Sequence, residues 1–209
     1  MNNWKSTREP GGESSLHKVD VYSSWNYRKI RTNFIRYSAG ILPYTYDSNG
    51  KCLFLLGKDH EGDWSDFGGR CEFKDRNDEK NTAAREFYEE TLGSVININD
   101  CLEKLAHGSP VKIVSNTLNG SPYYMFLLYV EYSNYTDTFT KVSNFLRFHY
   151  SNERHNINKI IEKNCIRWVS IDTLLNCMEN VENPPIILRG VFYKTIQGAK
   201  EQIIKLNNT

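Results

Sequence analysis

The stretch that decides the fold runs from Gly68 to Gly93 and reads Gly-Gly-Arg-Cys-Glu-Phe-Lys-Asp-Arg-Asn-Asp-Glu-Lys-Asn-Thr-Ala-Ala-Arg-Glu-Phe-Tyr-Glu-Glu-Thr-Leu-Gly. Two glycines open it, and three carboxylates follow near its end, at Glu86, Glu89 and Glu90. Because residues three and four apart are neighbours on a helix, these acids fall within roughly a third of the helix circumference. Like charges at that spacing repel by roughly a few tenths of a kcal/mol per pair, so the pattern predicts a cation between them.

A hard divalent cation suits these acids, since Mg²⁺ and Mn²⁺ take carboxylate, carbonyl and water oxygens and also hold substrate phosphates. The order Gly69, then Arg85-Glu86-Phe87-Tyr88-Glu89-Glu90, then Gly93 resembles the signature of the Nudix hydrolases. That signature is Gly-x5-Glu-x7-Arg-Glu-U-x-Glu-Glu-x-Gly-U, in which U is a bulky apolar residue. The resemblance covers roughly residues 36–180, about one ordinary domain.

The match departs from the family signature in three places. Its first acid is Asp75 rather than Glu, nine residues rather than seven separate Asp75 from Arg85, and Leu92 adds one residue before Gly93. The longer spacer enlarges the loop before the helix and leaves the helical acids in place. In the family the first acid pairs with the arginine of the signature, and three residues could take this role here: Asp75, Asp78 and Glu79.

The resemblance implies a hydrolase that cleaves a diphosphate, a reaction that needs charge neutralisation, alignment and a base. It implies that Glu86, Glu90 and the Gly69 carbonyl hold Mg²⁺ or Mn²⁺, with Glu89 as a further ligand or as a base. Arg85 would orient the carboxylates through paired hydrogen bonds rather than contact the substrate.

Nudix enzymes often take a base from the loop before a tryptophan-containing strand. Glu162, six residues before Trp168, lies at that place in the sequence, and Glu153 is the second choice. The alternative interpretation is that Glu162 is a solvated helix residue paired with Lys159 or Lys163.

The order of expected elements favours an α/β fold of the Nudix type, an α/β/α sandwich around a mixed β-sheet with helical insertions and a C-terminal helix. Strands are expected at 38–44, 51–57, 110–114, 123–132 and from residue 166, with turns at 47–50 and 119–120. The helix carrying the acids is expected to start near Asn81 and Thr82 and to end at Gly93. Phe87 should face the sheet, with Glu86 and Glu90 on the opposite side.

Four parts follow from these patterns. We expect a flexible N-terminal tail at 1–18, a basic and aromatic segment at 19–35, and the Nudix domain at 36–180. The insertion at 138–162 is polar, partly helical and placed where substrate selectivity is often found. The C-terminal extension, 181–209, repeats apolar residues with helical spacing from 186 to 206.

Composition sets the broad class of the protein. Its 209 residues are 39% hydrophobic, enough for the core of one domain, and no apolar run approaches 18 residues. We therefore expect a soluble, cytoplasmic protein, in the host cytoplasm if viral, with no membrane association. The five cysteines include no Cys-x-x-Cys pair, which favours reduced core thiols over a zinc site. A net charge of +1 means that any RNA contact must come from a local patch.

In length and in the residues of its motifs, the chain most resembles the mRNA-decapping Nudix enzymes of large DNA viruses. Those enzymes release m7GDP and leave a 5′-monophosphate RNA. Methylated guanine is cationic and requires aromatic neighbours, while RNA phosphates require basic ones. The candidates for substrate binding are Arg28, Arg31, Arg36, Tyr44 and Tyr150.

Two other functions stay open. The same signature serves Nudix hydrolases of free nucleotides, dinucleoside polyphosphates or diphosphoinositols. A non-catalytic Nudix-fold binding module is disfavoured, because catalytically dead relatives usually lose the acids that this chain keeps. The expected partner is capped mRNA or a nucleotide substrate, and no obligate protein partner can be inferred.

Overall fold

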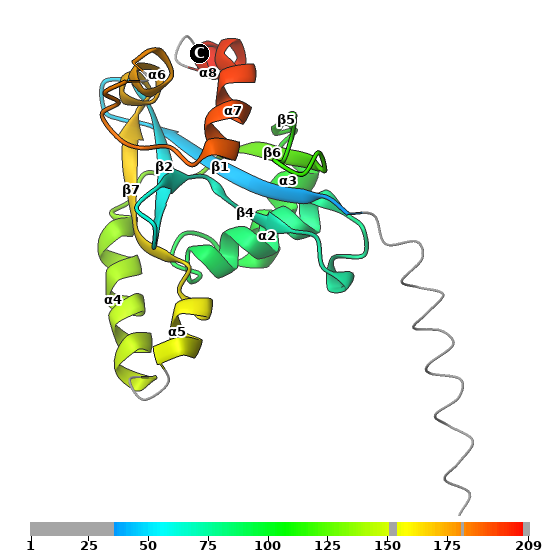
Figure 1. Ribbon diagram of the computed structural model, residues 1–209, viewed down its shortest axis with the longest axis vertical. Coiled ribbons are helices and arrows are strands. Elements are labelled where there is room, and N and C mark those ends of the chain that lie inside the picture. Colours follow the sequence, from blue (N-terminus) through cyan, green and yellow to red (C-terminus); the bar gives the residue numbers. More distant parts are fainter. Residues whose placement is uncertain (1–35, 151–153, 181, 207–209) are drawn as a thin grey trace, which may run out of the picture. The chain divides into compact units, whose positions relative to one another are not determined.

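The computed structural model describes residues 36–150, 154–180 and 182–206. The expected tail at 1–18 and the basic and aromatic segment at 19–35 lie outside these ranges. The unit that begins at Arg36 contains every strand and helix described below (Figure 1).

In the part of the chain that the structure describes, seven strands form one mixed sheet. They are β1 (Ser38–Tyr46), β2 (Cys52–Asp59), β3 (Trp64–Ser65), β4 (Phe67–Arg70), β5 (Val111–Asn116), β6 (Pro122–Tyr129) and β7 (Lys163–Ser170). The order is β3-β2-β1-β6-β5, with β4 paired to β1 and β7 paired to β2. Among these described strands, β1 and β6 run parallel and the other pairs are antiparallel. The predicted mixed sheet is confirmed.

The divergence of β1 and β2 makes room for the glycines. β1 pairs with β2 only over Tyr44–Tyr46, next to the predicted turn, in which the Gly50 amide donates to the Asp47 carbonyl oxygen at 3.0 Å. Over its first half β1 pairs instead with β4, where Ala39 lies opposite Gly69 and Gly40 opposite Gly68. A Cβ at Gly68 would lie 2.7 Å from the Gly40 Cα, so this close backbone approach requires glycine.

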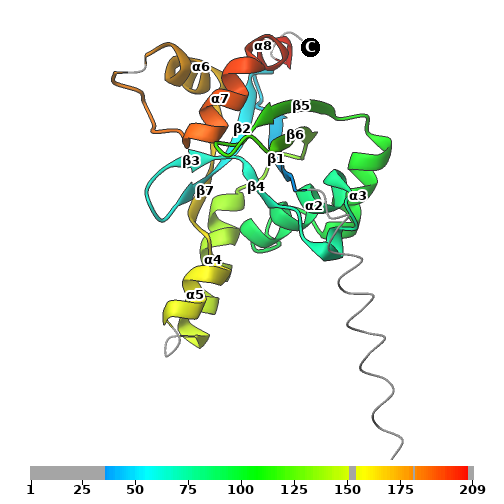
Figure 2. The same cartoon turned by 45° about the vertical axis from the view of Figure 1, so that its right-hand side comes forward.

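Helices cover both faces of the sheet (Figures 1 and 2). The helices α6 (Ile171–Glu179), α7 (Gly190–Gly198) and α8 (Lys200–Leu206) enclose a core with Leu42, Phe54 and Met125. On the other face α2 (Glu79–Glu90) packs on β1 and β4, and α3 (Ile98–His107) packs on α2. Successive strand residues point to opposite faces, so Ile41 and Leu42 are both fully buried, each worth about 2 kcal/mol. The predicted α/β/α sandwich is confirmed.

The helix that carries the acids begins earlier than the sequence suggests. Asp78, not Asn81, is its N-cap: the Asp78 side chain accepts hydrogen bonds from the amides of Lys80 and Asn81. The carboxylate of Asp78 therefore satisfies two amides that the helix leaves unpaired, and helical geometry starts at Glu79. Beyond the last helical residue, Gly93 has φ +65° and its amide donates to the Tyr88 carbonyl oxygen at 2.9 Å, as a left-handed terminus requires.

The expected insertion forms two helices, α4 (Tyr135–His149) and α5 (Arg154–Ile160), called the arm below. α4 packs on β7, where the Trp168 indole N–H donates to the Ser133 carbonyl oxygen at 2.9 Å and the Thr136 hydroxyl donates to the Ile166 carbonyl oxygen at 2.8 Å. The segment 138–162 is therefore partly helical, as expected, in its described residues. Glu162 lies between α5 and β7 rather than inside a helix.

The C-terminal segment differs from its expected single helical run. α7 ends at Gly198 and α8 starts at Lys200, with Ala199 between them, because glycine is a poor helix former. In the described ranges, no helix combines the length and apolar character needed to span a membrane.

Candidate active site

Arg85 and Asp75 form a buried, two-bonded ion pair beneath the acidic helix. Arg85 Nε donates to Asp75 Oδ1 and Arg85 Nη2 donates to Asp75 Oδ2, each at 2.9 Å. Asp75 also accepts from the Glu72 amide at 2.8 Å and the Thr82 hydroxyl at 3.0 Å. Burial alone would raise the pKa of Asp75, but the Arg85 guanidinium and the other donors hold it below its ordinary value.

The structure therefore selects one of the three acids that could pair with Arg85. Asp78 is occupied as the cap of α2, and Glu79 lies 3.1 Å from the Lys112 ammonium. Asp75 reaches Arg85 in spite of its shorter side chain because it lies in a 3₁₀ turn, η1 (Phe73–Asp75), that folds against the first turn of α2.

The remaining donors of Arg85 hold two of the predicted metal ligands. Arg85 Nη1 lies 2.8 Å from Glu86 Oε1 and donates to Glu89 Oε2 at 2.9 Å. Nη2 also donates to the Arg70 carbonyl oxygen at 2.9 Å, which ties α2 to β4. Arg85 thus fixes the orientation of both carboxylates.

Glu86 lies directly against the backbone of Gly69. A Cβ at position 69 would lie 2.5 Å from the Glu86 carboxylate, so the glycine lets this carboxylate, which Arg85 also contacts, lie against the strand. The Glu86 side chain is 12% exposed. Burial raises its pKa to about 7; Arg85 opposes this rise, whereas Glu89 and Glu162 add to it. Glu86 is therefore a buried acid with incomplete charge compensation.

Glu90 is more deeply buried and both of its oxygens are engaged. Oε2 accepts from the Gly68 amide at 2.8 Å, and Oε1 lies 3.2 Å from the Lys163 ammonium. Burial raises the pKa of Glu90 to about 8; Lys163 acts in the opposite direction, and Glu162 and Glu86 reinforce the rise. The expectation that Glu86 and Glu90 point away from the sheet is wrong. β4 and the start of β7 lie beside α2, so both side chains turn toward these strands.

Lys163 is a site residue that the sequence does not reveal. It is 1% exposed, and its ammonium donates to the Ser65 hydroxyl at 2.9 Å and the Asp66 carbonyl oxygen at 3.4 Å, besides its contact with Glu90. Its methylene stem lies beside Gly57, where a Cβ would be 2.9 Å from Lys163 Cδ. Of the two lysines proposed as partners of Glu162 in the alternative interpretation, Lys159 and Lys163, the second is therefore incorrect. The sequence offered one signal for this role of Lys163, namely a lysine at the start of a strand with alternating apolar residues.

Glu89 is the exposed member of the acidic group. Its side chain is 48% exposed, and besides the bond from Arg85 it receives one from Lys74 at 3.3 Å. Lys74 also lies 3.2 Å from Glu72, so Glu89 takes part in a surface network at the entrance to the site.

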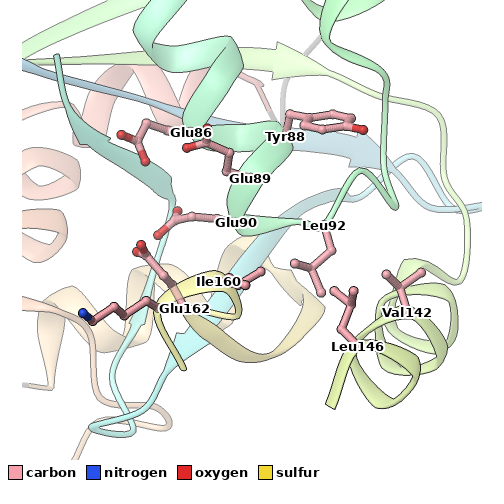
Figure 3. Close-up of a pocket in the computed structure, with 10 residues that line it drawn as sticks. Glu86, Tyr88, Glu89, Glu90, Leu92, Val142, Leu146, Ile160 and Glu162 are labelled. Carbon is pink, nitrogen blue, oxygen red and sulfur yellow. The ribbon is translucent and has the colours of Figure 1, made fainter. Parts of the chain in front are cut away.

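These acids open into a pocket of about 500 Å³. One side is acidic, with Glu162 pointing toward Glu90 in Figure 3. The opposite side is apolar and comes from the end of α2 and from the arm. The lining residues are Glu86, Glu89, Glu90, Glu162 and Lys159 on the polar side and Tyr88, Leu92, Val142, Leu146 and Ile160 on the apolar side.

The predicted substrate-binding residues that the structure describes, Arg36, Tyr44 and Tyr150, do not line this pocket. Tyr44 lies on the other face of the sheet, packed against the core under α6–α8 and edge-on to Tyr46 and Tyr129. Arg36 is exposed at the start of the described chain, and Tyr150 is exposed at the C-terminus of α4. Arg28, Arg31 and Glu153 lie outside the described residues, so their roles stay predictions.

A second acidic group in the described part of the chain lies elsewhere. Carboxylate oxygens of Asp59, Glu61 and Asp63 come within 4.8 Å of one another in the loop between β2 and β3. Asp59 Oδ1 already accepts from three backbone amides of this loop, those of Glu61, Gly62 and Asp63. The arrangement is explained by the turn itself.

No protein-family model matches the chain, and no curated protein matches it. Several solved structures are similar to this chain at low sequence identity. A Nudix hydrolase from M. smegmatis, RenU, has 13% identity over 81% of this chain and 86% of its own, with a TM-score of 0.45. The C. elegans Ap4A hydrolase has 13% identity over 84% of this chain and 97% of its own, with a TM-score of 0.41.

A third structure, the C-terminal domain of mouse MUTYH in complex with human PCNA, has 11% identity over 81% of this chain and 90% of its own, with a TM-score of 0.46. None of these three is described as an enzyme acting on mRNA caps. Overlaps this low do not identify an activity, which must be argued from the site.

Proposed function

We propose that this protein is a Nudix-type hydrolase that cleaves a diphosphate linkage with Mg²⁺ or Mn²⁺. The observation that carries the proposal is the convergence of Glu86, Glu89, Glu90 and Glu162 on one pocket. A diphosphate is an anion and would be repelled by these four acids, so binding requires a cation between substrate and protein. A helical acidic face without function would not bury two of its carboxylates against glycines.

The donor set fits a hard divalent cation. Glu86 and Glu90 offer largely buried carboxylate oxygens, and burial raises the pKa of both although Arg85 and Lys163 lie beside them. Position 69 leaves the space at Glu86 that a Cβ would fill. Glu86, Glu90, Glu89 and the Gly69 carbonyl would hold the ion, which when bound neutralises the phosphates and lowers the pKa of a water molecule.

Glu162 is the preferred base for accepting the proton of the attacking water. It is exposed to the pocket, points toward Glu90, and among the described residues no cation lies within 4.0 Å of its carboxylate. Glu89, the other candidate, is held by Arg85 and Lys74 and suits a ligand better. Arg85 acts through the carboxylates that it orients, and Glu153 keeps its place as second choice for the base.

Capped mRNA is the proposed substrate, with m7GDP and 5′-monophosphate RNA as products. The resemblance of the motif residues to those of viral decapping enzymes supports this choice. The apolar wall formed by Leu92, Val142 and Leu146 also supports it, because it offers a surface for a base or ring next to the acids. A free nucleotide or a dinucleoside polyphosphate is the second candidate, because a volume of about 500 Å³ is typical of small-ligand sites.

One observation keeps a non-catalytic binding module as the third candidate. The Lys163 ammonium already compensates Glu90, as a protein without metal would require. Two acids on the pocket side favour the enzyme: Glu86, whose charge Arg85 compensates only in part, and Glu162, which has no ion-pair partner among the described residues.

Cap-labelled RNA tests the proposal. The purified protein is incubated with this RNA and Mn²⁺ or Mg²⁺, and products are separated by chromatography. Release of labelled m7GDP that stops on addition of EDTA supports decapping. Cleavage of small nucleotides alone would reject capped RNA but keep the hydrolase, and no cleavage of any diphosphate would reject the hydrolase.

A further inference from the structure

A strip of exposed aromatic side chains with one lysine lies on α4 outside the pocket. It consists of Lys141, Phe145, Phe148 and His149, and we call it the α4 strip. Phe145 is 60% exposed and Phe148 is 79% exposed, which is unusual for side chains of this size. Both rings meet the His149 ring edge-on, with ring centroids 4.2 Å and 5.8 Å apart. The strip thus presents clustered aromatic faces to solvent.

The α4 strip continues the apolar wall of the pocket. Val142 and Leu146 line the pocket and are neighbours in sequence of Lys141 and Phe145. On a helix, residues four apart form rows, so the row with Val142 and Leu146 lies next to the row with Lys141 and Phe145. Figure 2 shows that the arm extends beyond the sheet. A ligand too long for the pocket would pass directly onto the strip.

The charge around the α4 strip favours an anionic ligand. The insertion at 138–162 contains four lysines or arginines and two acids, Glu153 and the pocket residue Glu162, whereas the whole chain has a net charge of only +1. The only acid in α4 is Asp137, in its first turn, which is hydrogen-bonded to Asn134 at 2.7 Å. A face that binds protein would have an apolar centre depleted of lysine, but here Lys141 and His149 stand among the aromatic rings.

We propose that the α4 strip binds single-stranded RNA, with unstacked bases on Phe145 and Phe148 and phosphates near Lys141 and His149. Exposed aromatic faces beside a lysine and a hydrogen-bonding imidazole suit a single strand, because every base has a face to stack and every nucleotide has a phosphate. The inference rests on the proposed function and narrows it. The diphosphate that enters the pocket would end an RNA chain rather than belong to a free nucleotide.

Binding of an uncleavable RNA tests the strip without any reaction. The probe is a 5′-monophosphate single strand of roughly ten nucleotides with a 3′ fluorophore, followed by anisotropy in the absence of metal. For the double variant Phe145→Ala and Phe148→Ala we expect Kd to rise at least about tenfold, because stacking on each ring is lost. Equal affinity of variant and wild type, or no binding by wild type, would overturn the proposal.

A matched control removes two exposed apolar side chains from the opposite edge of the sheet. Val114 in β5 and Leu118 in the following turn are 60% and 75% exposed. Their double replacement by alanine should leave the Kd for the RNA within about twofold, since surface changes of this kind have small effects. A loss equal to that of the α4 variant would mean that the RNA has no preferred surface, which also overturns the proposal.

Measurements of kcat/KM distinguish the proposed RNA binding by the α4 strip from the proposed hydrolase activity. Wild type should cleave capped RNA of this length with a kcat/KM at least about tenfold above that for the cap dinucleotide, and the α4 double variant should lose this preference. Equal kcat/KM of wild type for both substrates rejects the strip. Tight RNA binding without cleavage of either substrate rejects the proposed function and leaves the strip standing.

Discussion

The two sides of the pocket are built in opposite ways. On the α2 side, Arg85, Asp75, Glu86 and Glu90 are largely or fully buried and bonded to one another, to Lys163 or to backbone groups. On the α4 side, the wall has no such network and continues into side chains that are mostly exposed. The difference teaches that the reacting part of a substrate would meet a rigid, preorganised surface, while the rest would meet an open one.

Replacement of Glu86 by Gln breaks the rigid side and should have the largest effect. Loss of its charge next to Gly69 removes an anionic ligand, and we expect kcat/KM for the cleaved diphosphate to fall by about 10³-fold. Steady-state kinetics at saturating Mn²⁺ give the comparison. Glu103→Gln, on the exposed side of α3, is the matched control and should stay within about twofold. Near-normal activity of Glu86→Gln would remove it from the site.

Asp75→Asn tests whether the rigid side depends on its buried ion pair. Arg85 would keep a buried charge without its partner, so the free energy of unfolding should fall by about 3 kcal/mol. Urea denaturation measures it. Asp78→Asn is the control, because asparagine caps a helix as well as aspartate does, and it should change stability by less than about 0.5 kcal/mol. Equal effects of the two variants would show that the pair contributes little.

Glu162→Gln tests the base at the boundary between the two sides. It should lower kcat by about 10²-fold and leave the free energy of unfolding nearly unchanged, because Glu162 is exposed and acts on a proton. Glu89→Gln serves for comparison and should also abolish most turnover, but with weaker Mn²⁺ binding as measured by calorimetry. If the kcat of Glu162→Gln stayed within about threefold of wild type, Glu162 would not be the base, and that role would be assigned to Glu89 or Glu153.

Leu146→Ala probes the open side and should have the smallest effect. The side chain lines the pocket but is only half-buried, so the lost contact should raise KM by roughly fivefold with kcat nearly unchanged. A fall in kcat equal to that of Glu162→Gln would show that α4 positions reacting groups, and the contrast between the two sides would then disappear.

The sequence predicted the rigid side better than the open one, for physical reasons. The acids, Arg85 and Gly93 lie within one helix and its terminus, where spacing translates directly into geometry. The choice of Asp75 among three acids depends on the fold of a 3₁₀ turn, and the role of Lys163 depends on a contact 73 positions distant in sequence, with Glu90.

Tyr44 shows how little the pattern of a strand predicts about which face of the sheet a residue lies on. Alternation predicts that neighbouring residues face opposite sides, but not which side receives α2, and a shift of one residue exchanges the two faces. Tyr44 thus faces the core under α6–α8. The sequence also did not predict the pocket wall on α4. The residues of the insertion have a helical pattern, but this pattern does not show where the helices pack.

The central claim is that the acidic pocket cleaves a diphosphate with a divalent metal. Its most direct test is mass spectrometry of the products formed by wild type and Glu86→Gln from capped RNA and from a dinucleoside polyphosphate, each with Mn²⁺ and with EDTA. We predict cleavage at the diphosphate of at least one substrate, only by wild type and only with Mn²⁺. Intact substrates in every wild-type sample, or equal cleavage by Glu86→Gln, would contradict the claim.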